Sequence, residues 1–389
     1  MTGSCRRPAG LARGGAAAWL ACLIAAAAGL AATEAPGCPF CGSVSPSLAE
    51  RRDAALAVAI GESAGPVTDR DGVFLQPCRV RQPLRGPIAA DALVSARVAA
   101  PIEGTALLLE EAPARWQALA ANETLLAHVV GAPAVTAPAA ERLTWFATRL
   151  EHPDPRIAED AFAEFGRASF QALCAAAGAL DAENLRSWIA EPGIDERRRG
   201  FYGLALGVVA TQSAEKQAAC RAALRAALEA PADDFRAGFD GILAGLLVAE
   251  GPRGLRAIED RGLLAADARA GDARHLLAAL RFAWEELAAT LPREATAAAT
   301  ARLLANPAVA ADATIDLARY AAWEPVDAVA GLWGTLGRDD PLVRRAVAGY
   351  LTACPREAAR AAEARIAAAD PEAWQAARRA AALPVRNAD

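Results

Sequence analysis

The chain has few of the residues that catalytic and nucleic-acid-binding sites most often need. It has three histidines, 5% aromatic residues and one methionine. The histidines, His128, His152 and His275, lie too far apart for metal-ligand spacing. No glycine-rich phosphate loop or basic stripe with interleaved aromatics occurs. These absences argue against a nucleotide-binding enzyme and a nucleic-acid partner, and we expect no cofactor or metal.

Lysine is almost absent, because Lys216 is the only one and arginine supplies every other basic side chain. A GC-rich coding bias explains this usage. The alternative is a selected use of arginine forks, whose planar donors recognise carboxylate and phosphate groups. The formal net charge is −5.

The first 32 residues have the pattern of a secretory signal peptide. Arg6, Arg7 and Arg13 form a positive region, the apolar run 16–32 follows, and small residues at its end offer a cleavage site. The alternative is an uncleaved anchor, but alanine is weakly apolar and the run is slightly short for a span. We therefore expect Sec-type export to the periplasm or the medium. No later segment is apolar enough to span a membrane, so no stable span is expected after cleavage.

The motif Cys38-Pro39-Phe40-Cys41 is the sharpest chemical signal in the sequence. Two thiols at this spacing can cycle between dithiol and disulfide, or share a metal ion. The local string resembles a glutaredoxin active site, which implies Cys38 as nucleophile and Cys41 as resolving thiol. However, no strand precedes the motif and no second Cys/His pair stands near it. In an oxidising compartment a structural disulfide is the commonest outcome, between Cys38 and Cys41 or from either to Cys78.

Short strands are predicted after this motif. Apolar or alternating segments at 54–61, 73–80, 93–98 and 105–109 are separated by Gly, Pro and Asp turns. Four to five strands at this spacing favour a small antiparallel barrel or sheet.

The sequence therefore predicts a Cys-stapled β-rich domain over 36–131, ending at a proline-bearing linker, 132–138. Its cysteine-rich start, a short helix near 46–52 and the strand at 54–61 resemble the netrin and tissue-inhibitor-like oligonucleotide-binding-fold barrels. Those families use their N-terminal cysteines as disulfide staples.

An alanine-rich helical tract is predicted over 139–385. Apolar residues recur at steps of three to five, and proline or glycine breaks leave segments of about ten to twenty residues. Asp154, Asp195 and Asp340 each precede an amphipathic stretch, and Arg344 follows the last of them. These stretches resemble HEAT-type repeats. The resemblance implies a helical solenoid used as a scaffold or binding surface.

The predicted fold class is therefore α+β, with a small antiparallel β-barrel or sheet followed by a HEAT-like solenoid. We expect an exported, non-catalytic binding or scaffold protein whose partner is another envelope or extracellular protein. The alternative is an envelope thiol–disulfide or metal-handling protein that uses Cys38 and Cys41. Protease inhibition by the front domain is a third possibility, for which the sequence gives little support.

Overall fold

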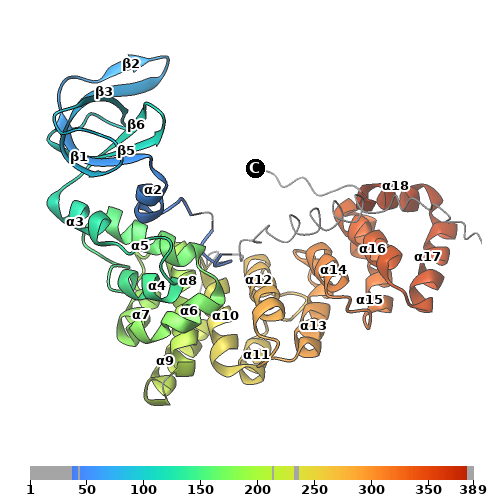
Figure 1. The fold of residues 1–389 in the computed structure, drawn as a ribbon. Helices are drawn as coiled ribbons and strands as arrows, with labels where there is room; N and C mark the ends of the chain where they lie inside the picture. The colour runs from blue at the N-terminus through green and yellow to red at the C-terminus, as the bar shows by residue number, and fades with distance from the viewer. Residues whose placement is uncertain (1–36, 43, 213, 232–235, 383–389) are drawn as a thin grey trace, which may run out of the picture. The chain divides into compact units, whose positions relative to one another are not determined.

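A computed structural model describes residues 37–42, 44–212, 214–231 and 236–382 (Figure 1). The chain is α+β: one short helix and then the strands come first, and helices fill the sequence from 123 onward. The expected leader, 1–32, lies outside the described residues. No helix in the described ranges is long and apolar enough to cross a membrane.

Five strands close into a small barrel, and a sixth strand extends it. The strands are β1 (Ala57–Ser63), β2 (Thr68–Arg70), β3 (Val73–Arg85), β4 (Leu93–Arg97), β5 (Thr105–Ala112) and β6 (Arg115–Ala120). The order is β1-β5-β6-β4-β3, and β1 also pairs with β3, which closes the barrel. The β4–β6 pair is parallel and the others are antiparallel, while β2 forms a hairpin with β3. The predicted barrel is confirmed, although β6 was not expected.

Strand β5 joins the barrel to the helices because both of its faces are buried. Ala106 and Leu108 point into the barrel, where they pack with Cys78 and Val80. The alternate side chains, Leu107 and Leu109, pack outside the barrel in a second cluster with Ala55, Val58, Leu125, Val129 and Ile157. A strand covered on both sides has a continuous apolar run, as the segment 106–109 has.

Most of the helices lie in the alanine-rich tract. The α-helices are α2 (Leu48–Ala54), α3 (Glu123–Gly131), α4 (Ala139–Ala147), α5 (Pro155–Arg167), α6 (Phe170–Ala176), α7 (Ala182–Ala190), α8 (Glu196–Gln212), α9 (Ala214–Glu229), α10 (Phe239–Glu250), α11 (Pro252–Asp260), α12 (Ala270–Glu286), α13 (Arg293–Arg302), α14 (Ala310–Arg319), α15 (Val326–Gly331), α16 (Pro341–Ala353), α17 (Glu357–Ala369) and α18 (Pro371–Ala382). Short 3₁₀ turns lie at η1 (Ala177–Ala179), η2 (Leu303–Ala305), η3 (Leu332–Gly334) and η4 (Leu336–Arg338). Proline opens α5, α11, α16 and α18, where its missing N–H costs no helical hydrogen bond. The boundaries between α5 and α6 and between α8 and α9, however, fall where the sequence has no proline or glycine break.

Helices two apart along the chain pack on one another in series. Contacts join α4 to α6, α6 to α8, α8 to α10, α10 to α12, α14 to α16 and α16 to α18. Between α12 and α14, Trp284 stacks on Tyr320 with ring centroids 4.1 Å apart, and Arg281 pairs with Asp316 at 2.5 Å. Among the odd-numbered helices, α7 contacts α9 and α15 contacts α17.

Helices α8 and α10 approach each other closely because glycines lie at their contact. Gly203 and Gly207 of α8 lie against the backbones of Ile242 and Gly245 of α10, and Gly241 of α10 lies against Gly200 of α8. A Cβ on Gly207 would lie 2.5 Å from the Cα of Gly245, a separation that real Cβ atoms do not show. The missing side chains therefore let the two backbones touch.

Candidate functional site

The Cys38–Cys41 motif lies on the helices and not on the barrel. The Cys38 N–H donates to the Gly166 carbonyl of α5 at 2.9 Å. Phe40 is buried edge-on against Phe282 of α12, with ring centroids 5.4 Å apart, and Cys41 is fully buried. The motif was predicted to begin the β-rich domain at 36–131, but the structure packs it into the large hydrophobic cluster that the helices form.

Burial makes Cys41 a poor nucleophile. Loss of solvent raises the pKa of the Cys41 thiol, the hydrogen bond with the Cys38 side chain raises it further, and Arg197 opposes the shift. The two side chains are thus direct neighbours, although the structure describes them as free thiols. The disulfide between them stays a prediction.

Cys78 does not meet the other two thiols. It is buried inside the barrel in a hydrophobic cluster separate from that of Cys41, and its thiol donates to the Gln76 carbonyl at 3.7 Å. Burial raises the pKa of the Cys78 thiol as well. The predicted staple from the motif to Cys78 is not formed in this structure, because the motif follows the helices while β3 carries Cys78 into the barrel.

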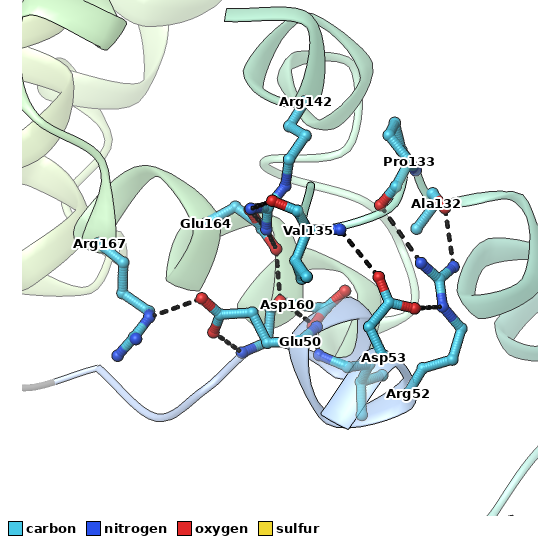
Figure 2. A network of polar contacts seen from close by, with 12 residues as sticks. Glu50, Arg52, Asp53, Ala132, Pro133, Val135, Arg142, Asp160, Glu164 and Arg167 are labelled. Carbon is cyan, nitrogen blue, oxygen red and sulfur yellow. Dashed lines mark hydrogen bonds and ion pairs between the residues drawn. The ribbon is translucent and has the colours of Figure 1, made fainter. Parts of the chain in front are cut away.

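Helix α2 is held to α5 by a buried polar network that the sequence analysis missed (Figure 2). The Ser47 hydroxyl donates to Glu164, and the Leu48 N–H donates to Asp160 at 2.5 Å. Arg142 of α4 donates to both carboxylate oxygens of Glu164, one at 2.6 Å. Arg167 and Glu50 pair at 3.0 Å on the exposed side (Figure 2). Burial raises the pKa of Glu164, against the lowering effect of Ser47 and Arg142.

A second branch of the network contains the buried pair His128 and Asp160. His128 Nε2 lies 2.7 Å from the Asp160 carboxylate, and the imidazole packs against Trp145 and Phe146 with centroids 5.1 and 5.8 Å away. Both side chains are 3% exposed. The pair therefore ties α3 to α5.

Arg52 and Asp53 attach the predicted linker 132–138 to α2. Arg52 donates to the Val129 and Ala132 carbonyls, each at 2.7 Å, and Asp53 accepts from the Val135 N–H at 2.8 Å (Figure 2). A sequence signal for this network exists in α5. Asp160 and Glu164 are four residues apart, so they share one face of α5, and that face is otherwise apolar. Carboxylates on a buried face require hydrogen-bond or charge partners.

The aspartates of the repeat-like stretches are helix caps. Asp154 accepts from the Arg156 N–H at 3.0 Å, Asp195 from the Arg197 N–H at 2.9 Å, and Asp340 from the Leu342 N–H at 2.8 Å. Each side chain therefore satisfies an N–H group in the first turn of its helix.

Arg344 has a structural role in α16. Its Nε donates to the Gly337 carbonyl at 2.5 Å, its guanidinium lies 5.2 Å from the Trp333 ring centroid, and it pairs with Asp370 at 3.6 Å. Neither Arg344 nor the capping aspartates gather into a common site. The residues singled out by the repeat resemblance therefore shape helices and do not form a reaction centre.

A cleft of binding-site size lies among α7, α8, α9 and α10. Its volume is about 700 Å³, within the range of ordinary ligand sites. Apolar side chains line it: Ile189, Ala190, Ala223, Ala226, Ala227, Ala230, Pro231, Ala237, Phe239 and Ile242. The polar lining consists of Glu183, Arg186, Ser187, Arg199 and Arg236. We take this cleft, the α7–α10 cleft, as the candidate functional site.

Two of the cleft's arginines are held in place by backbone carbonyls. Arg199 donates to the Glu191 carbonyl at 2.7 Å, which fixes its guanidinium at the end of α7. Arg236 donates to the Ala230 carbonyl at 2.7 Å, and its guanidinium lies 4.3 Å from the Phe239 ring centroid. Arg236 also pairs with Asp272 at 3.8 Å, whereas the hydrogen bonds that hold Arg199 go to carbonyls, which leave its positive charge at the cleft.

Comparisons with known proteins assign no relative. No protein family matches the chain, and neither a curated protein nor a solved structure matches it.

Proposed function

We propose that this is an exported, non-catalytic binding protein that docks another envelope or extracellular protein on a HEAT-like helical-repeat surface. The serial contacts of the even-numbered helices, together with α7–α9 and α15–α17, support the repeat part of this proposal. In repeat proteins each helical pair packs on its neighbours, and the resulting extended surface is what partners bind. The capped starts of α5, α8 and α16 support it as well.

The barrel supports the likeness to an oligonucleotide-binding-fold domain. If β2 is taken as an extension of β3, the five closing strands pair in the cyclic order first, second, third, fifth, fourth. The third and fifth, β4 and β6, are parallel. This connectivity is that of the five-stranded Greek-key barrel to which the family resemblance pointed. We carry over from this resemblance only the type of domain, and not the inhibitory activity of those families.

The α7–α10 cleft is the observation that carries the binding function. It opens between successive helices of the series, and its lining combines apolar surface with arginine. Aromatic or aliphatic anchors of a partner bind such hollows in protein interfaces. The thiol–disulfide alternative has less support, because Cys41 is fully buried and its pKa is raised.

Site-specific photo-cross-linking tests the proposal. A benzoylphenylalanine placed at Ala226 points into the cleft, whereas the same probe at Ala222 of α9 stands outside the cleft lining. Both positions are exposed, so neither replacement disturbs the core. We expect irradiation of the producing cells to give a defined cross-linked protein from position 226 and not from 222. Identical cross-link patterns from the two positions, or none from either, would refute a docking role for this cleft.

A further inference from the structure

We infer that the α7–α10 cleft takes a small anionic amphiphile, a ligand with one carboxylate on an apolar body. The inference rests on the proposed function in using the same cleft, and it adds the chemical class of what binds there. The ligand's carboxylate would meet Arg186 and Arg199, and its apolar part would cover the floor of the cleft.

The floor provides apolar surface without filling the hollow. Ala223 and Ala227 on α9 are half-buried, and Phe239 and Ile242 on α10 are buried beneath the cleft. Alanine on α9 leaves space where a larger side chain would close the gap to α7. An apolar chain entering this space removes apolar surface from water on both sides, which is the main source of affinity in such sites.

The rim provides positive charge that the chain does not neutralise. Arg186 is exposed and has no hydrogen-bond or ion-pair partner among the described residues. Arg199 uses Nη2 for the Glu191 and Pro192 carbonyls, which leaves Nη1 as a donor. A planar guanidinium donates two parallel hydrogen bonds to a carboxylate, so one oriented arginine beside one unpaired arginine suits that group.

A neighbouring hollow strengthens the positive field. It has a volume of about 440 Å³ and lies on the other side of α9, where Arg221, Arg225, Arg253 and Glu250 line it. Each lining carries three arginines and one glutamate, a formal charge of 3 − 1 = +2, in a chain whose net charge is −5. Asp272, which pairs with Arg236 at 3.8 Å, offsets one of the positive charges of the α7–α10 cleft. A positive region on an acidic protein attracts anions and repels cations of the same shape.

Calorimetric titration of the mature full-length chain with decanoate and with decyltrimethylammonium tests the inference. The two probes share a ten-carbon chain and differ in the sign of the head-group charge. We expect decanoate to bind at least about tenfold more tightly than decyltrimethylammonium. The arginines can donate charge-assisted hydrogen bonds to the carboxylate of decanoate, whereas they repel the quaternary ammonium group. The preference should shrink between roughly 0.05 and 0.5 M salt, since exposed charges are screened. Equal affinities at low salt would overturn the inference.

Two pairs of variants place the binding in the cleft. Ala226→Phe puts a ring into the hollow, and Ala222→Phe puts the same ring on the exposed surface of α9 outside its lining. Arg186→Gln removes a rim charge, and Arg256→Gln removes an exposed arginine of α11 that lines neither hollow. We expect A226F to abolish decanoate binding and R186Q to weaken it about tenfold. A222F and R256Q should bind as the parent does; equal effects within either pair would overturn the inference.

The two proposals fail separately. If decanoate binds as expected but no protein is cross-linked from position 226, the amphiphile site stands and the protein-docking role falls. If a partner is cross-linked from position 226 but decanoate and decyltrimethylammonium bind equally, the docking role stands and the amphiphile site falls.

Discussion

The glycine contact between α8 and α10 predicts opposite effects for the same substitution in two helices. Gly207→Ala places a methyl group against the backbone of α10, where it would meet the carbonyl oxygen and Cα of Gly245. Gly349→Ala, in α16, places its methyl group 3.7 Å from the Ala381 Cβ, which is ordinary van der Waals contact. Both changes exchange glycine for the best helix former within a helix.

The expected magnitudes follow from these two environments. Alanine gains about 0.8–1 kcal/mol over glycine in a helix interior, and G349A should show most of this as increased stability. Overpacking a core costs about 1–3 kcal/mol even where side chains can move aside. At Gly207 the obstacle is backbone, so α8 and α10 must separate and lose apolar contacts as well. We expect G207A to be destabilised by about 2 kcal/mol net of the propensity gain.

Urea unfolding followed by circular dichroism measures both free-energy changes against the parent chain. G245A, which removes the opposing glycine, should resemble G207A, because its methyl group would meet the backbone of Gly203. The reasoning would be refuted if G207A were as stable as G349A, since the two helices would then have room between them that the structure does not show.

Three further predictions concern the anchored Cys38–Cys41 motif, the buried polar network and a helix cap. Phe40→Ala should cost about 3–5 kcal/mol and expose residues 37–42 to hydrogen exchange, because the ring anchors this segment on the helices; unchanged exchange would contradict the anchoring. Arg142→Met should destabilise by about 3–5 kcal/mol by leaving Glu164 buried and unpaired, and adding Glu164→Gln should recover part of that loss in urea unfolding. Hydrogen bonds from Arg156 lower the pKa of Asp154, so the ionised Asp154 contributes fully to stability above its unfolded pKa of about 3.8, and this contribution is lost as the pH falls further. The free energy of unfolding of D154N should therefore depend less on pH between about pH 4 and 2 than that of the parent. An unchanged pH dependence in this range would contradict the prediction.

Local features of the sequence predicted many of the elements. The short helix near 46–52 is α2, and the strands expected at 73–80, 93–98 and 105–109 lie within or around β3, β4 and β5. The short β6 was missed, because only Pro113 and Ala114 separate its segment, 115–120, from β5.

The candidate site was beyond what the sequence predicted. The α7–α10 cleft is lined from four helices between Glu183 and Ile242, and its depth depends on small side chains on α9 facing larger ones on α10. The buried polar network was also beyond prediction, because its partners are distant in sequence: Ser47 and Glu164 are 117 residues apart, and Leu48 and Asp160 are 112 apart. No spacing rule links residues at such separations.

The sequence by itself determined the features whose energy is local. Asp154, Asp195 and Asp340 cap their helices because a side-chain oxygen and a free N–H two residues later lie close together whatever else the chain does. Only the tertiary structure decided where the Cys38–Cys41 motif, the buried carboxylates and the arginine-rimmed cleft would lie. Their positions depend on which distant helices approach closely enough to exclude water, and that is set by the packing of the whole chain.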